Sequence, residues 1–349
     1  MLSVSARRVV HLLPGLGVGG SERLVLELCA HLDPRFEQHV VLSRATSVTP
    51  WWPEALEPRV RIHLARGRVP QTLAGLDPGL VHAPYWGVDD AALRALVAAD
   101  GGLPLVLSAT DGHDPLRGPA IRVTVFCCAA QRDAVEAPPV PHAVVHNGIS
   151  RPAPITAAER VAARRRLALG NAEEVVVVMA RIHHDKVNAA GFDAVATLLR
   201  ERPAATVLVL GSGDRLAAWR RRAAASGAGP RVRFCGLVPR PRPQLAAADL
   251  LLHPVRRDTF PYAVLEALGI GLPVVALDLP GLREMCGDAA VLAASPVAAG
   301  REAAGLLADP ARRARLAGAG RGRAAGFGAA ATAEAYARVF DSVLATGRP

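Results

Sequence analysis

The chain has little of several features that would assign it to a specialised class of protein. Only 4% of its 349 residues are aromatic, and no apolar run approaches the ~18–20 residues of a membrane-spanning helix. The five cysteines lack the paired spacing of metal ligands, so we interpret them as buried thiols in a reducing compartment. The apolar segment Val9–Leu13 runs directly into glycines, which predicts a first strand instead of a signal peptide. We therefore expect a cytoplasmic protein, either free or in peripheral contact with the inner face of the membrane.

Lysine is almost absent although the chain is basic. The formal net charge is +10, and of the 41 Lys and Arg residues only Lys186 is a lysine. Keeping one lysine among so many arginines favours a need for a compact ammonium group at that position. The arginines are not interleaved with aromatic side chains, so the sequence carries no signature of nucleic-acid binding. The charge is then either a solvated arginine-rich surface or a contact for anionic lipid or a phosphorylated substrate.

Short apolar segments alternate with helical patterns along the chain. Arg8–Leu13 and Glu174–Met179 are typical of buried strands, and leucines recur at helical spacing over Ser21–Leu32. Such alternation predicts a parallel sheet with helices on both faces. The proline-rich segment Arg151–Pro154 marks a boundary between residues 1–150 and the rest of the chain. We expect an α/β protein of two doubly wound, Rossmann-like domains, with ligands at the carboxyl ends of the strands in a central cleft.

The stretch Leu250–Glu284 has the pattern of strand, loop, helix, strand and loop, with two acids eight residues apart. Asp258 falls in the first loop, and Glu266 falls in the helix, which we expect to have Pro261 in its first turn. A carboxylate in so apolar a helix needs a partner with hydroxyls or positive charge. The N–H groups at the helix start form a site for anions and polar groups. The pattern therefore indicates a site for a sugar nucleotide.

A glycine-rich loop follows the first predicted strand. Gly15, Gly17 and Gly20 match the dinucleotide-binding pattern G-x-G-x-x-G. The acid expected at the end of the next strand is absent, but Arg44 lies there and could suit a 2′-phosphate, so an NADP enzyme stays an alternative. The simpler interpretation is that Gly19 and Gly20 let the backbone approach a phosphate at the helix start.

Two cations follow the strand that ends at Met179. Arg181 and Lys186 stand five residues apart just past its carboxyl end, where a pair of positive charges can hold a diphosphate. A second glycine turn, Gly211–Asp214, follows the next strand and is either ordinary turn chemistry or a ligand contact.

Histidines and acids elsewhere in the chain raise the question of a metal. His183, His184 and His253 are one group, and the segment Asp111–Asp114 with His113 is another. Neither group is accompanied by further ligands at metal spacing, and the chain contains no D-x-D motif. We therefore predict no metal site and no metal cofactor. His113 is either a catalytic residue or a loop histidine with ordinary hydrogen bonds.

Taken together, these motifs make the chain resemble the retaining GT-B glycosyltransferases of glycosyltransferase family 4. The resemblance covers nearly the whole chain and is dense in the second half. It is carried by Gly19–Glu22, Asn147-Gly148, Arg181 with Lys186, Gly211–Gly213, Ala248-Asp249, Asp258–Pro261, Leu265–Ala267, Gly271–Val275 and Gly281–Glu284. It implies a nucleotide-sugar-binding domain over residues 151–326 and a last helix, 327–349, that crosses back to the first domain.

The resemblance also implies roles for individual residues. Glu266 would hold the ribose hydroxyls of a nucleotide-sugar donor, and Asp258 would lie near the hydroxyls of the sugar. Arg181 and Lys186 would neutralise the diphosphate, which Gly19 and Gly20 would approach from the other domain. The other residues implied at the donor site are Gly211 in the second glycine turn, Gly236 and Leu237 beside the base, and Phe260, Pro261, Tyr262 and Ala263 at the helix start.

The chain departs from the family pattern at two places. The first acid is usually Glu, and Asp258 is one methylene shorter. The family often has a histidine where the strand ending at Ser108 stops, whereas this chain has Ala109–Asp111 there and His113 slightly further on. We assign His113 to the catalytic site on this basis.

The function implied is retaining, metal-independent transfer of a hexose or N-acetylhexosamine from a nucleotide sugar, with UDP as the expected nucleotide, to an acceptor hydroxyl. Small natural products, lipid-linked sugars and envelope glycans all fit as acceptors. The alternatives are a GT-B nucleotide-sugar epimerase, an NADP-dependent oxidoreductase and a noncatalytic nucleotide-sugar-binding subunit.

Overall fold

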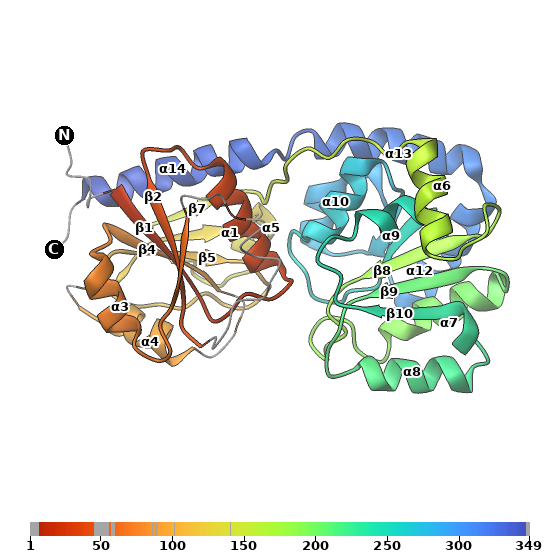
Figure 1. Ribbon diagram of the computed structural model, residues 1–349, viewed down its shortest axis with the longest axis horizontal. Coiled ribbons are helices and arrows are strands. Elements are labelled where there is room, and N and C mark those ends of the chain that lie inside the picture. Colours follow the sequence, from red (N-terminus) through yellow and green to blue (C-terminus); the bar gives the residue numbers. More distant parts are fainter. Residues whose placement is uncertain are drawn as a thin grey trace. The chain divides into compact units, whose positions relative to one another are not determined.

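The computed structural model describes residues 7–44, 56, 60–85, 87, 90–100, 102–139 and 141–346. The chain divides into two compact units, one of Met1–Ser150 with Phe327–Pro349 and one of Arg151–Gly326 (Figure 1). Each unit is built on its own parallel sheet with helices on both faces. The predicted α/β class with two Rossmann-like domains is therefore confirmed.

The sheet of the first unit has the order β3-β2-β1-β4-β5-β6-β7. Its strands are β1 (Arg8–Leu13), β2 (Glu37–Leu42), β3 (Arg61–Leu64), β4 (Leu80–Tyr85), β5 (Leu105–Ala109), β6 (Ile121–Phe126) and β7 (His142–Val144). The helices are α1 (Gly20–His31), α3 (Val69–Leu76), α4 (Ala91–Ala98), α5 (Ala129–Asp133) and α14 (Ala329–Ala345). Because alternate residues of the strands point to opposite faces, one core forms under α3 and α4 and another under α1. Helix α14 lies against α1 (Figure 1).

The sheet of the second unit has the order β10-β9-β8-β11-β12-β13. Its strands are β8 (Val175–Met179), β9 (Thr206–Leu210), β10 (Val232–Gly236), β11 (Leu250–His253), β12 (Val274–Leu277) and β13 (Val291–Ala293). Its helices are α6 (Ala157–Arg166), α7 (Gly191–Glu201), α8 (Leu216–Ala225), α9 (Arg242–Ala247), α10 (Tyr262–Ile270), α11 (Pro280–Cys286), α12 (Pro296–Ala308) and α13 (Pro310–Ala324), with short 3-10 turns at Gly229–Arg231 and Gly287–Ala289.

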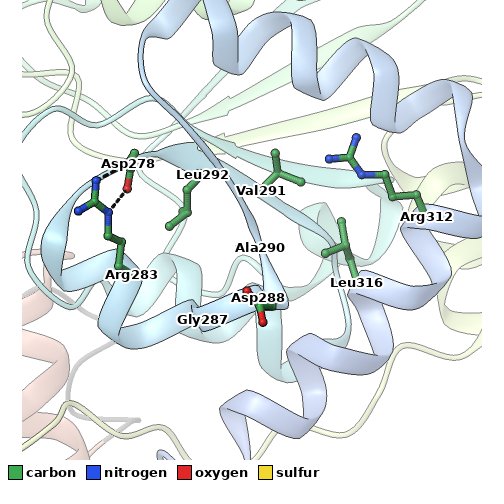
Figure 2. Close-up of a pocket in the computed structure, with 9 residues that line it drawn as sticks. All are labelled: Asp278, Arg283, Gly287, Asp288, Ala290, Val291, Leu292, Arg312 and Leu316. Atoms are coloured by element: carbon green, nitrogen blue, oxygen red, sulfur yellow. Dashed lines mark hydrogen bonds and ion pairs between the residues drawn. The ribbon is translucent and has the colours of Figure 1, made fainter.

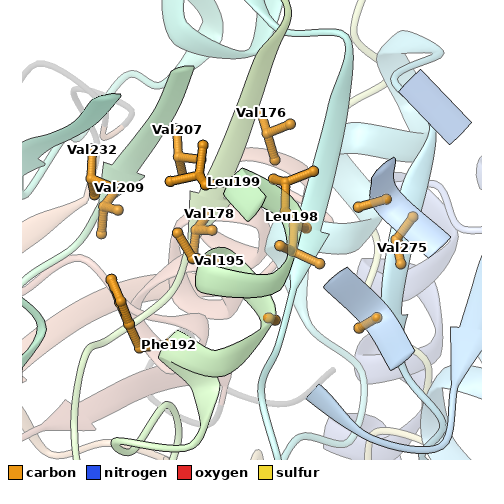
Figure 3. Packing of buried hydrophobic residues seen from close by; sticks show 14 of the residues in the cluster. Val176, Val178, Phe192, Val195, Leu198, Leu199, Val207, Val209, Val232 and Val275 are labelled. Carbon is orange, nitrogen blue, oxygen red and sulfur yellow. The ribbon is translucent and has the colours of Figure 1, made fainter. Parts of the chain in front are cut away.

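The core of the second unit fixes where its strands end. Val176 and Val178 of β8 point toward α7, whose apolar residues recur at helical spacing from Phe192 to Leu199 (Figure 3). These side chains are almost fully buried, and each contributes about 1.5–3 kcal/mol through burial. Because the central strands are held in this way, the loops at their carboxyl ends start from fixed positions.

The structure corrects two local expectations. Helix α10 begins at Tyr262, so Pro261 is its N-cap residue and does not lie in the first turn. The segment expected as a loop after β12 contains helix α11, which is too short to show a helical pattern in the sequence. This helix starts tightly against the loop of Asp258, since a Cβ on Gly281 would lie 1.9 Å from the carbonyl oxygen of Thr259. Among the described residues, no helix has both the length and the apolar character needed to cross a bilayer.

Candidate functional site

The strand order of the second unit creates a point where neighbouring loops diverge. β8 pairs with β11, and the chain continues from β8 toward β9 and from β11 toward β12, on opposite sides of that pair. The loops that follow β8 and β11 therefore separate, and such switch points are the usual ligand sites of open α/β sheets. Lys186 lies in the first loop and Asp258 in the second.

Asp258 is enclosed by two cationic or protonatable side chains. Lys186 Nζ lies 3.4 Å from its Oδ1, and His253 Nε2 lies 3.4 Å from its Oδ2. Lys186 and Asp258 are only 12% and 14% exposed. Burial by itself would raise the pKa of Asp258, but the charge of Lys186 and then the contact with His253 lower it to about 2. The carboxylate is therefore ionised at neutral pH and is held between two side chains from different strand ends.

Arg181, the other predicted cation, is half-buried at the start of the same loop as Lys186. Its charge acts on Asp185, which lies between the two cations in the sequence. Burial would raise the pKa of Asp185, but the hydrogen bond from His183 and the positive charges nearby, Arg181 included, hold that pKa below its usual range. The loop after β8 is thus strongly positive, with one acid paired inside it.

Helix α10, which begins four residues after Asp258, has one half-buried face. Ala263 and Glu266, three residues apart, lie on this face, while Phe260 and Tyr262 are buried. The first hydrogen bonds of the helix run from the N–H groups of Val264 and Leu265 to Pro261. The N–H groups of Tyr262 and Ala263 precede these bonds and lie at the positive end of the helix. The helix start, where the sequence predicts a polar site, therefore lies on the same edge of the sheet as Asp258.

The glycines of the second unit hold the two loops of β8 and β9 together. Gly211 has φ +149°, and a Cβ there would lie 1.9 Å from the carbonyl oxygen of Ala180. Ile182 N–H donates to the carbonyl of Ser212 at 3.0 Å. Gly236, also at positive φ (+71°), accepts from the N–H of Gly211 at 2.7 Å, and the next side chain, Leu237, is 52% exposed. Close packing thus requires glycine at position 211.

The predicted residues of the first unit lie at the carboxyl ends of its strands. Gly19 is the N-cap of α1, and the Glu22 carboxylate lies against this loop, accepting from Gly17 N–H at 3.3 Å. An acid at this place is favoured by the positive end of the helix. His113 follows β5, and its ring covers Gly87, where a Cβ would come within 2.7 Å of the imidazole.

One contact was not foreseen in the sequence. His253 entered the sequence analysis only as a candidate metal ligand, but in the structure it lies beside Asp258. Its position at the end of a strand was a usable signal, since strand ends carry the ligand sites of this fold class. The pairing of Lys186 with Asp258, 72 residues apart, depends on strand order and could not be read from spacing.

A pocket of about 500 Å³ lies elsewhere in the second unit (Figure 2). It is lined by Asp278, Arg283, Gly287, Asp288, Ala290, Val291, Leu292, Arg312 and Leu316. Asp278 pairs with Arg283 at 2.5 Å and 2.7 Å on one side of it (Figure 2). None of these lining residues is among those predicted to bind a donor.

The sequence is similar to known glycosyltransferases. Residues 173–309, which include Lys186, Asp258 and Glu266, match the family model described as "Glycosyl transferases group 1". The D-inositol 3-phosphate glycosyltransferase of Thermobispora bispora is 32% identical over 73% of this chain and 63% of that protein. The protein of the same name from Streptomyces scabiei is 30% identical over 93% of this chain and 87% of that protein. The chain thus spans less than two thirds of the first relative and most of the second.

Solved structures share the fold at low sequence identity. The Anabaena protein HepE in complex with UDP-glucose aligns with a TM-score of 0.78 at 17% identity, over 96% of this chain and 99% of that chain. WaaG, a glycosyltransferase involved in lipopolysaccharide biosynthesis, aligns with a TM-score of 0.74 at 16% identity, over 95% and 99% of the two chains. Both the fold and the sequence relatives agree with the resemblance seen in the motifs. The chain belongs to the GT-B glycosyltransferases of glycosyltransferase family 4.

Proposed function

We propose that this protein is a retaining glycosyltransferase that moves a hexose or N-acetylhexosamine from a nucleotide sugar to an acceptor hydroxyl. The observation that carries the proposal is the contact of Lys186 with Asp258 at the switch point of the second sheet, beside the start of α10. UDP is the proposed nucleotide, because HepE was solved in complex with UDP-glucose. The names of the sequence relatives make D-inositol 3-phosphate the first acceptor to test.

The proposed chemistry follows from where charge develops. Breaking the bond between the sugar C1 and the phosphate oxygen builds positive charge on the sugar and negative charge on the nucleotide diphosphate. The Lys186 ammonium, with Arg181, stabilises that negative charge, and the surrounding buried groups make the interaction stronger than in water. The acceptor oxygen bonds to C1 on the face that the diphosphate leaves, and its proton passes to the departing phosphate oxygen. No step of this proposal uses a metal.

The two acids have separate tasks in this proposal. Asp258 is ionised, so it accepts hydrogen bonds from the hydroxyls of the donor sugar. Glu266 lies about one turn along α10, on the same half-buried face as Ala263, and binds the ribose hydroxyls. Arg181, Gly236 and Leu237 complete the proposed donor site in the second unit, and Gly19, Gly20 and His113 are the proposed contributions of the first unit.

Donor-dependent release of free nucleotide, measured with UDP-, GDP-, ADP- and dTDP-sugars and then with an acceptor panel, tests the proposal. Glu266→Ala and Lys186→Ala should each abolish most of the activity, whereas Arg301→Ala, which removes an exposed cation on α12, should not. Full activity in both site variants would refute the residue assignments. Isomerised donor formed without acceptor would identify an epimerase instead, saturable NADPH binding would favour an oxidoreductase, and donor binding without turnover would indicate a binding subunit.

A further inference from the structure

Two loops of the second unit bring together three side chains, two histidines and one aspartate, of the types that bind metal ions. His183 and His184 follow β8, and Asp214 follows β9, thirty residues further along the chain. His184 Nδ1 lies 3.1 Å from Asp214 Oδ2, and His183 Nε2 lies 3.9 Å from Asp214 Oδ1. One nitrogen from each histidine and one carboxylate oxygen all lie within 4.8 Å of one another. Sequence spacing alone did not reveal the group, because the third ligand comes from another strand.

The tautomer of His183 is set by a second carboxylate. His183 Nδ1 lies 2.5 Å from Asp185 Oδ1, so this nitrogen donates its proton to the acid. Nε2 then carries the lone pair, and it is the nitrogen that faces Asp214. Metal-binding histidines are usually oriented in this way, with the non-ligating nitrogen donating to a carboxylate. The arrangement therefore has an outer partner as well as three ligands.

The ligand atoms have nearly the separations that a small cation requires. Zinc bonds of about 2.0–2.1 Å in tetrahedral geometry place neighbouring ligand atoms about 3.3 Å apart. The two histidines contact different oxygens of Asp214, at 3.1 Å for His184 and 3.9 Å for His183. The loops that carry the ligands are cross-linked by backbone bonds, since His184 N–H donates to Asp214 Oδ1 at 3.1 Å and Arg215 N–H donates to Ile182 at 3.0 Å. The two loops are therefore held together, and rotation of the imidazole rings is the movement that would bring their nitrogens to one ion.

We propose that His183, His184 and Asp214 form a binding site for a divalent transition-metal ion of the zinc type, with water in the remaining positions. Two imidazoles and one carboxylate favour Zn²⁺, Co²⁺, Ni²⁺ or Cu²⁺ over Mg²⁺ and Ca²⁺. The His184 side chain is 59% exposed, so an ion can reach the site from solvent. None of the three proposed ligands is a residue of the proposed donor site, and the inference does not depend on the proposed activity.

Titration of the chain, without a histidine tag, with Zn²⁺ in a calorimeter and with Co²⁺ under visible absorption tests the site. We expect saturable binding of about one ion per chain and Co²⁺ bands typical of nitrogen and oxygen ligands, with no competition from excess Mg²⁺. His184→Ala and Asp214→Asn should each weaken binding at least about tenfold, and Asp185→Asn about 10–100-fold through the orientation of His183. His31 is an exposed histidine that also neighbours an acid, so His31→Ala is the matched control and should leave the affinity for Zn²⁺ unchanged.

Substitution of Arg215 should strengthen metal binding, in contrast to the substitutions above. Its Nε lies 3.7 Å from Asp214 Oδ2, so Arg215 competes with a cation for that oxygen. Arg215→Gln should therefore tighten Zn²⁺ binding a few-fold. The site is overturned if the unaltered chain shows no saturable binding, or if the variant with both His184→Ala and Asp214→Asn, folded by circular dichroism, binds Zn²⁺ as tightly as the His31→Ala control.

Discussion

In the first unit, hydrogen bonds join His11, His82 and Ser108 across the neighbouring strands β1, β4 and β5. In the second unit, the notable polar contact, that of Lys186 with Asp258, lies beyond the ends of β8 and β11. The first group is almost completely buried within its sheet, whereas the second is charged and partly exposed. Polar side chains thus occur in two settings in the same class of fold, within a sheet and beyond its strand ends. The two groups differ in their protonation and in their exposure.

The proton positions in the first unit are fixed by its hydrogen bonds. The Gln38 amide NH₂ donates to a backbone carbonyl, so its oxygen accepts from His11 Nε2 at 3.1 Å. His11 Nδ1 therefore accepts from His82 Nδ1 at 2.8 Å. His82 Nε2 then accepts from Ser108 at 2.8 Å, and Ser108 accepts from the Tyr336 hydroxyl at 2.7 Å. Each histidine carries one proton, and a second proton on either would break a hydrogen bond.

The pKa values of the two groups move for different reasons. Burial, with a smaller contribution from the charge of His39, lowers the pKa of His11 to about 4, although the bond to Gln38 opposes the shift. Burial and then His11 lower the pKa of His82 well below its usual range. At Asp258 burial acts in the opposite direction, and Lys186 overcomes it. The buried histidines of the first unit are therefore neutral, whereas Asp258 of the second unit is charged.

The largest expected effect is on the charged group. Lys186→Ala should reduce nucleotide release by about 10²–10³-fold, as the loss of one group that stabilises developing negative charge does. It should also raise the pKa of Asp258, since Lys186 is the main group that lowers it. Initial rates at saturating donor measure the first effect, with Arg301→Ala as the control. A Lys186→Ala protein as active as the control would show that the charged group of the second unit has no role in the reaction.

The buried histidines and Asp258 should respond to acid over different pH ranges. The pKa of His11 is 6.5 in the unfolded chain and about 4 in the folded one, so the stability it contributes is complete above pH 6.5 and is lost as pH falls toward 4. At ~1.4 kcal/mol per pKa unit, the loss in free energy of unfolding is about 3 kcal/mol. Asp258 contributes nothing to this window, because its pKa moves from 3.8 to about 2 and its loss comes only at lower pH.

Urea unfolding followed by circular dichroism between pH 7 and pH 4 measures this loss. The variant His11→Phe removes the titrating group, so its unfolding free energy should change less with pH over the same range. An equal slope in both proteins would show that the buried histidine chain does not control the acid response.

Removing the central member of the buried hydrogen-bonded series should lower the free energy of unfolding without lowering the rate of nucleotide release. His82→Ala leaves His11 and Ser108 without their partner, and we expect a loss of about 2–3 kcal/mol in unfolding free energy. Thermal unfolding measures the loss, and His142→Ala, a half-buried histidine with one backbone contact, is the control. The rate per folded molecule should remain within about twofold in both variants. A hundredfold loss of rate with stability intact would instead make His82 part of the reaction.

The smallest expected effect is at Tyr336, the last donor of the buried hydrogen-bonded series. Tyr336→Phe removes only the last donor, which joins α14 to β5 through Ser108. We expect a loss of about 1 kcal/mol, measured by the same unfolding experiment. A loss as large as that of His82→Ala would mean that the order of donors and acceptors described above is wrong.

The sequence was sufficient for the fold because the fold depends on local patterns. Alternating apolar strands and amphipathic helices, with glycine turns after β1 and β9, predicted the doubly wound sheets. Several short elements were missed, α11 and β13 among them. Helix α11 has seven residues and β13 has three, and neither is long enough to show a period. Their existence depends on packing, such as the close approach of Gly281 to Thr259.

The site was predictable only in part, for a related reason. The spacing of Asp258 and Glu266 and the single lysine are features of the chain itself. The contact of Asp258 with His253, and that of His184 with Asp214, arise when different strand ends are placed side by side. Spacing along the chain carries no information about such contacts, so the partners of these two histidines could not be predicted from the sequence.

The central claim is that Lys186 holds the diphosphate of the donor, and UDP binding tests it most directly. Calorimetry with UDP should give saturable binding to the unaltered chain and to Arg301→Ala with equal affinity. Lys186→Ala should bind UDP at least about tenfold more weakly, because a partly buried charge pair with the phosphate is lost. Equal UDP affinity in Lys186→Ala and Arg301→Ala would contradict the account.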